Sequence, residues 1–262
     1  MGTADDLAFD AIKMGAQMLY FKMKNNSRAK AFRAMASEHQ LEFWQKPADY
    51  HGEIESIDAS EHLTETQKMS RPLSMKAKMA SRFFGDSPFQ TKLWAFSTNR
   101  FRGGWQTNCN IMEGRWKGHM MTSFDTMHYE VDGEGEYSSV FAHCTGRLPR
   151  AIITPTGMIA GMKRAEEGQM LNWGYHKMSF ELHDFNKRYR VLSADEKLTM
   201  DFISQAMIEY LMDHRKEKWH IELAPAGILI STMFTLAPKV VAQAMDFLAG
   251  FIDHIDKDLL EA

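Results

Sequence analysis

The feature that most constrains the fold is an alternation of side-chain type over residues 105–111 and again over residues 120–126. Trp105 and Thr107 alternate with Gln106 and Asn108, and the same period continues on the far side of a short glycine-framed segment, from Met120 to Thr126. A period of two is typical of β-strands, because successive side chains point to opposite faces of a sheet. This stretch therefore predicts two antiparallel strands.

The segment between these strands raises a functional question. In NIMEGRWKGHMMTSFD, Asn110 to Asp125, Gly114 and Gly118 stand on either side of Arg115, Trp116 and Lys117. A phosphate-binding loop would carry G-K-[ST] and lead into a helix, and this segment does neither. We therefore expect a hairpin connection whose basic side chains face solvent.

Further strands and helices can be predicted around this hairpin. A basic helix is expected over residues 27–39, a short strand at LEFW, a turn at Asp132–Glu136, a strand over Tyr137–Thr145 and another at RAIITP, followed by a short helix to about Arg164. Residues 47–80 show little pattern, which indicates a loop or an insertion.

A second group of elements follows. We expect strands at MSFEL and KRYRVLS joined through His183–Asn186, one helix from Ser193 or Asp195 to Asp213, a hairpin at WHIEL-APAG-ILIST and a C-terminal helix from Pro238. The predicted fold class is α+β, mainly antiparallel sheet in two successive strand–helix units. The expected divisions are 1–26, 27–165 with the 47–80 insertion, and 176–262.

The N-terminal helix, expected over residues 4–24, has an unusually wide apolar face. Its candidate contact residues are Leu7, Ala11, Ile12, Met14, Met18 and Leu19. The cations Lys22, Lys24, Arg28, Lys30 and Arg33 follow, which suits a helix lying on an anionic membrane surface. Packing or self-association is favoured over membrane binding, because Asp5, Asp6 and Asp10 would be repelled by such a surface. Both alternatives stay open.

Composition narrows the classes of function. The net charge is -3, with 44% hydrophobic and 25% charged residues, so any nucleic-acid site has to be local. The N-terminus carries acids where a signal peptide has basic residues, and no run of 18 apolar residues occurs. The expected location is the cytoplasm, with peripheral attachment at the inner face of the membrane as an option. Cys109 and Cys144 are expected as buried thiols, and a disulfide between them stays open.

The order of the motifs resembles a family of uncharacterised, mainly actinobacterial, membrane-associated proteins that carry a domain of unknown function. The motifs are SPFQ, NIMEGRWKGHMMTSFD, GRLPRAIITPTGM, the segment 180–213 and WHIELAPAGILI, covering roughly residues 28–256. The most specific part is Phe185-x-x-x-Tyr189-x-Val191 followed by Ala194-Asp195. Family members usually have transmembrane segments before the basic helix, whereas this chain has the amphipathic segment 4–24. The resemblance implies a fold and supplies no activity.

A second candidate surface combines basic and aromatic residues. Two stretches, NRFRGGW and GRWKGH, contribute Arg100, Arg102, Trp105, Arg115, Trp116 and Lys117. If the stretches are neighbours, they form a cationic aromatic ledge of the kind that stacks single-stranded bases. The ordinary alternative is a solvated sheet edge with the tryptophans packed beneath it, which the negative net charge favours.

No motif points to catalysis. The sequence has eleven histidines but no H-E-x-x-H or H-x-H, and no G-x-S-x-G or Cys–His pattern. His183 and Asp184, read as strand neighbours, would point to opposite faces. We expect no metal and no cofactor. The expected function is a non-catalytic protein-interaction or scaffolding module, whose partner is another protein, a membrane surface or a second copy of the chain. A single-stranded nucleic-acid binder and an unrecognised hydrolase are the alternatives.

Overall fold

The structure is a computed structural model that describes residues 26–46, 49, 105–130, 133–144, 146–156, 168, 170–172, 174–232 and 234–260, with the backbone alone at 105–107, 128–130 and 133–135. The predicted N-terminal helix therefore lies outside the described residues. So do the 47–80 insertion, apart from Asp49, and the helix expected to end at about Arg164.

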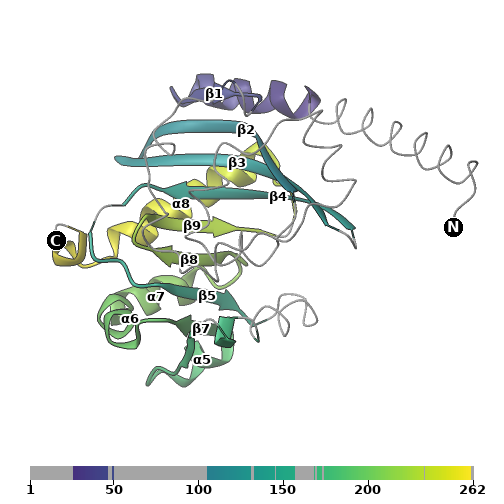
Figure 1. Ribbon diagram of the computed structural model, residues 1–262. Helices are drawn as coiled ribbons and strands as arrows, with labels where there is room; N and C mark the ends of the chain where they lie inside the picture. Colours follow the sequence, from purple (N-terminus) through teal and green to yellow (C-terminus); the bar gives the residue numbers. More distant parts are fainter. Residues whose placement is uncertain are drawn as a thin grey trace, which may run out of the picture.

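One antiparallel sheet organises the described part of the chain (Figure 1). Its strands are β1 (Glu42–Trp44), β2 (Trp105–Trp116), β3 (His119–Glu130), β4 (Gly133–Ala142), β5 (Ala151–Pro155), β6 (His176–Met178), β7 (Tyr189–Ser193), β8 (His220–Ala224) and β9 (Gly227–Ser231). Their spatial order is β1-β2-β3-β4-β9-β8-β5-β7-β6. The α+β class with mainly antiparallel sheet is thus confirmed.

The predicted layout of two successive strand–helix units is wrong. Strand β4, from the first predicted unit, pairs with β9 from the second, with Val140 opposite Ile230. Strand β5 pairs with both β7 and β8. The strands of both units therefore join one sheet, because the chain returns to insert β9 and β8 beside β4 instead of closing each half separately.

The helices are α5 (His183–Arg188), α6 (Glu196–Phe202), α7 (Gln205–Asp213), α8 (Pro238–Asp253) and α9 (Lys257–Leu260), and residues 26–38 are also helical. The single helix expected up to Asp213 is divided into α6 and α7. Ser204 divides it, because its hydroxyl accepts a hydrogen bond from the Met207 amide and caps a new helix. The strand expected at MSFEL is largely wrong, because of its residues only Met178 lies in a strand, β6. The connection expected at His183–Asn186 belongs to helix α5.

The main core lies between one face of the sheet and α6, α7 and α8. A row of paired residues crosses seven strands on this face: Met112, Ser123, Val140, Ile230, Ile221, Ile153 and Val191. All of these except Ser123 belong to one hydrophobic cluster with Leu211, Leu248 and Phe251. Trp219, Ile221 and Leu223 belong to the same cluster, and α8 contributes the buried residues of one face to it.

The expected hairpin turn is confirmed, but it is shorter than the predicted connection between Gly114 and Gly118. Strand β2 runs through Gly114 to Trp116, and only Lys117 and Gly118 form the turn, with φ of 48° and 92°. Positive φ at both positions is the geometry of a type I′ hairpin turn. Arg115 and Lys117 are exposed, as expected.

The alternation predicted along β2 is interrupted at Asn110. The pairing shifts register between Cys109 and Met112, and Asn110 has a φ of 52°. A bulge of this kind adds one residue to a strand and exchanges the faces beyond it. Met112, and not Ile111, therefore joins the main core cluster. Cys109 and Cys144 are both buried thiols, and burial raises the pKa of the Cys144 thiol to about 12.

Two glycines test how closely the sheet is packed. Gly227 begins β9 with a φ of 141°, and a Cβ there would meet the carbonyl oxygen of Ala142 on the neighbouring strand. Gly118 also has a positive φ, but a Cβ there would meet nothing within 4 Å. Both alanine variants incur backbone strain of roughly 1–2 kcal/mol. We expect Gly227→Ala to lower the free energy of unfolding by at least about 2 kcal/mol more than Gly118→Ala, because β4 and β9 must separate.

Urea denaturation followed by circular dichroism measures this difference. Equal losses of stability in the two variants would show that the β4–β9 pairing tolerates an added methyl group, contrary to the packing described above.

Candidate functional site

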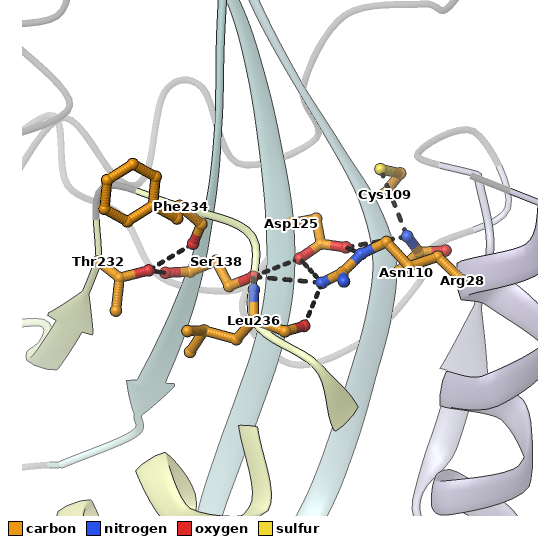
Figure 2. Close-up of polar contacts among 8 residues, drawn as sticks. All are labelled: Arg28, Cys109, Asn110, Asp125, Ser138, Thr232, Phe234 and Leu236. Carbon is orange, nitrogen blue, oxygen red and sulfur yellow. Dashed lines mark hydrogen bonds and ion pairs between the residues drawn. The ribbon is translucent and has the colours of Figure 1, made fainter. Parts of the chain in front are cut away.

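A cluster of polar contacts joins the helix of residues 26–38 to the centre of the sheet (Figure 2). We call it the Arg28 node, and it comprises Arg28, Asn110, Asp125, Ser138 and Leu236. Arg28 Nε donates to Asp125 Oδ2 at 2.7 Å and Nη2 donates to Oδ1 at 2.9 Å, a bidentate pair. Such pairs are the strong charge-assisted hydrogen bonds of proteins.

The other residues of the Arg28 node make further hydrogen bonds with the Asp125 carboxylate and the Arg28 guanidinium. Ser138 Oγ donates to Asp125 Oδ1 at 2.6 Å, and Asn110 Nδ2 donates to Asp125 Oδ2 at 2.9 Å. Arg28 Nη2 also donates to the Leu236 carbonyl oxygen at 2.6 Å. The exposed fractions of the Arg28 and Asp125 side chains are 15% and 5%. The node therefore links the helix, β2, β3, β4 and the loop before α8 through one neutralised charge pair.

Strand β4, through Ser138, also holds the loop between β9 and α8. Ser138 donates its backbone N–H to the Phe234 carbonyl oxygen at 3.2 Å, and Thr232 Oγ1 donates to that oxygen at 2.6 Å. The Leu236 N–H donates to Ser138 Oγ at 2.8 Å. Figure 2 shows the Phe234 ring pointing away from these contacts. The loop thus presents an aromatic ring while its backbone is hydrogen-bonded to β4.

The predicted N-terminal contact residues lie outside the described residues: Leu7, Ala11, Ile12, Met14, Met18 and Leu19. The helix that follows them is amphipathic. It buries Ala29, Phe32, Met35 and Ala36 and exposes Lys30 and Arg33. Among the described helices, none is long and apolar enough to cross a bilayer.

The predicted basic–aromatic ledge is divided by the structure. Arg100 and Arg102 lie outside the described part of the chain. Trp105 begins β2 and Trp116 ends it, so the length of a 12-residue strand, roughly 35 Å, separates them. The described residues therefore do not bring the two stretches together.

The basic turn residues are engaged with helix α8. Trp116 Nε1 donates to Asp246 Oδ1 at 3.0 Å, and Lys117 Nζ lies 2.8 Å from the same oxygen. The Trp116 ring is buried, with the His39 ring centroid 4.5 Å away. Partial burial raises the pKa of Asp246, but the hydrogen bonds from Lys117 and Trp116 outweigh it and lower this pKa below 3.8. Asp246 thus neutralises the charge that a nucleic acid would need from Lys117.

The face of the sheet opposite the main core carries two buried clusters of hydroxyl, imidazole and carboxylate groups. In the first, Thr122 Oγ1 donates to Glu113 Oε2 at 2.6 Å and lies 2.8 Å from His143 Nε2. In the second, Thr154 Oγ1 lies 2.9 Å from His220 Nδ1, and His220 Nε2 lies 3.3 Å from Glu222 Oε1. Glu113 and Glu222 are both buried.

In these clusters the buried polar atoms find their hydrogen-bond partners among one another on this face of the sheet. Among the described residues, no three His, Cys, Asp or Glu side chains lie close enough to hold a metal ion. Sequence reasoning missed both clusters, because their members come from different strands. The His220-x-Glu222 spacing on β8 was the available signal, since alternate strand residues share a face.

Removal of the Arg28 charge tests the node. Arg28→Met leaves the Asp125 carboxylate buried without its cation, so we expect the free energy of unfolding to fall by about 3–5 kcal/mol. Lys30→Met, an exposed position on the same helix, should change it by less than about 0.5 kcal/mol. Chemical denaturation of both variants measures the difference. The double variant Arg28→Met/Asp125→Asn should recover part of the loss, and a single variant as stable as Lys30→Met would contradict the node.

The lowered pKa of Asp246 predicts a pH dependence. Its ionised form is stabilised in the folded state, so its contribution is present above pH 3.8 and is lost as the pH falls through the lower folded-state value. Asp246→Asn should therefore be less stable than the wild type at neutral pH, with the difference shrinking below about pH 3.8. Thermal unfolding across this range checks it, with Asp201→Asn on α6 as the control. A difference that stays constant down to pH 2 would contradict the assignment.

Comparison with known proteins gives little further identification. No family model matches the chain, and no curated protein matches it. Among solved structures, the chain is similar to the crystal structure of the mycobacterial trehalose monomycolate transport factor A, TtfA, at 12% identity and a TM-score of 0.45, covering 86% of this chain and 92% of that chain. A likeness at this level assigns no function to the chain, and the resemblance to the actinobacterial family stays a prediction.

Proposed function

We propose that this chain is a non-catalytic protein-interaction or scaffolding module that attaches to a partner or a membrane surface through residues 4–24. The observation that carries the proposal is the Arg28 node. It joins the helix that follows the attachment segment to the central strands through a buried, bidentate ion pair. The helix of residues 26–38 is therefore held in a defined position relative to the sheet.

The sequence of the segment suits attachment. Its apolar residues leave only a narrow polar stripe, and an apolar face of this width needs cover from a membrane, a partner or a second copy of the chain. A peripheral location at the inner face of a membrane belongs to this proposal, as does a homo-oligomer.

The alternative of a single-stranded nucleic-acid binder has less support. Lys117 is paired with Asp246, and the Trp116 ring is buried instead of lying open for base stacking. An unrecognised hydrolase has no described feature in its favour beyond the two hydroxyl–imidazole–carboxylate clusters.

Two adjacent substitutions in the full-length chain test the attachment. Met18→Asp places a charge in the apolar face of the segment, whereas Gln17→Asp places the same charge in the polar stripe. We expect Met18→Asp to weaken vesicle binding or self-association at least about tenfold, because a buried carboxylate must be desolvated. We expect Gln17→Asp to change either by less than about twofold.

Vesicle flotation measures membrane binding, and size-exclusion chromatography with light scattering measures self-association. The proposal fails if the wild type shows neither property, or if the two variants behave alike in both measurements. Unfolding midpoints equal to that of the wild type confirm that both variants retain the fold.

A further inference from the structure

We propose that the fold contains a pH-dependent junction, in which α7 and the β2–β3 turn hold helix α8 more firmly when three histidines are protonated. The histidines are His119 at the start of β3, His214 directly after α7 and His254 directly after α8. We call these residues, together with Tyr210 and Asp253, the histidine junction. The inference goes beyond the proposed function and does not depend on it, because the whole junction lies in the described part of the chain and outside the attachment segment.

The histidine junction closes the C-terminal ends of two helices in the same way. His214 is the C-cap residue of α7, and its Nδ1 donates to the Tyr210 carbonyl oxygen at 2.9 Å. His254 is the C-cap residue of α8, and its Nδ1 donates to the Gly250 carbonyl oxygen at 2.7 Å. A carbonyl oxygen only accepts hydrogen bonds, so each Nδ1 carries a hydrogen and the second proton of each ring enters at Nε2.

The two imidazole rings lie against the same tyrosine. The centroid of the Tyr210 ring is 4.1 Å from that of His214 and 4.6 Å from that of His254, with interplanar angles of 34° and 33°. Gly250 makes this packing possible, because a Cβ there would lie 2.6 Å from the Tyr210 hydroxyl oxygen. That hydroxyl donates to the Phe247 carbonyl oxygen at 2.7 Å. Burial raises the pKa of this phenol, so it stays neutral at neutral pH and presents its ring face to a cation.

The third histidine joins the β2–β3 turn to the end of α8. His119 Nε2 lies 2.8 Å from Asp253 Oδ1, and this contact is an ion pair only when the imidazole is protonated. The same turn contacts α8 at Asp246, which accepts a hydrogen bond from Trp116 and pairs with Lys117. The ring of His39, at the end of the helix of residues 26–38, lies on Trp116. The turn is therefore held at two points of α8, and the contact at Asp253 strengthens as the pH falls below neutrality.

Positive charge on these rings meets negative charge at each site. The C-terminal end of a helix carries a partial negative charge, and neither α7 nor α8 has a Lys or Arg in its last turn. The other charged residues around the junction are nearly balanced, with the acids Asp213, Glu217, Asp246, Asp253, Asp256 and Asp258 and the cations Lys117, Arg215, Lys216, Lys218 and Lys257. Of these cations, Lys117 is paired with Asp246, and Arg215 donates to the Met212 carbonyl oxygen at 2.8 Å. A proton on His214 or His254 therefore gains a helix end and an aromatic face, and a proton on His119 gains the Asp253 carboxylate.

Thermal unfolding of the full-length chain at about pH 8 and about pH 6 tests the proposal, because histidine changes its charge within this range. Each variant is compared with the wild type at the same pH, so that the other histidines of the chain cancel. The main variant is His214→Gln/His254→Gln, because glutamine can still donate to the two carbonyl groups but stays neutral. His119→Gln removes the ion pair with Asp253. The control is His183→Gln, since His183 is exposed at the start of α5 and lies outside the junction.

The contribution of the junction is present where the rings are protonated and is lost as the pH rises. We therefore expect the wild type to exceed the double variant in unfolding midpoint by about 5 °C more at the lower pH than at the higher. His119→Gln should show the same trend by about 2 °C, and His183→Gln by less than about 1 °C.

Two further measurements locate the effect. His254→Arg carries its charge at both pH values, so it should unfold at a higher temperature than the wild type at the higher pH and at the same temperature at the lower. Hydrogen exchange, corrected for its intrinsic pH dependence, should show stronger protection of the α7 amides at the lower pH in the wild type but not in the double variant.

The opposite results overturn the inference. A difference between wild type and double variant that is equal at both pH values shows that the rings act without their charge. An equal trend in His183→Gln shows that the effect belongs to histidines in general and not to the junction. A shift in midpoint without a change in α7 protection shows that the charges do not act at the contact between α7 and α8. If the double variant does not fold, His254→Arg decides alone, and a midpoint no higher than that of the wild type at the higher pH contradicts the proposal.

Discussion

The ion pair between Arg28 and Asp125 connects parts of the chain that are otherwise distant. Asp125 lies on β3 with an almost completely buried side chain, where an unpaired carboxylate would strongly destabilise the fold. The guanidinium that neutralises it is that of Arg28, 97 residues before Asp125 in the sequence. The same guanidinium donates to the carbonyl oxygen of Leu236, 208 residues after Arg28. The helix of residues 26–38, the central strands and the loop before α8 are consequently positioned together, and each requires the others to be in place.

The sheet itself explains why the two halves of the sequence do not fold as separate units. A strand pair such as β3–β4 can form locally, but β4 is completed only when β9 pairs with it. Strand β9 in turn arrives with β8 as a hairpin, and β8 then pairs with β5. Because the central pairings join residues far apart in the sequence, an apolar row continues across both predicted units and a single core forms under α8.

Local patterns predicted much of this structure, and long-range pairing accounts for most of the errors. The β2–β3 hairpin, the β8–β9 hairpin and α8 follow from period two, turn residues and a helical apolar face, all of which act within about 20 residues. The bulge at Asn110 was not predictable, because alternation gives no sign of an inserted residue. The α6–α7 break depends on the Ser204 cap, which a continuous apolar pattern hides. The Arg28 node and the two hydroxyl–imidazole–carboxylate clusters need the strand order, which no local signal supplies.

The two basic stretches of the sequence differ in how the fold treats their charges. Lys117 was a candidate for binding nucleic acid by sequence, yet the fold brings Asp246 to within 2.8 Å of it and neutralises the charge inside the molecule. The cations of residues 11–37 have no acid among them in the sequence, and Lys30 and Arg33 are exposed on the described helix. Asp5, Asp6 and Asp10 precede these cations in the sequence, however, and Asp125 neutralises Arg28, so the net charge of this part of the chain is smaller than its number of cations. Salt screens the attraction of exposed charges beyond about 10 Å, so Lys30 and Arg33 act only on a partner that lies close to the helix.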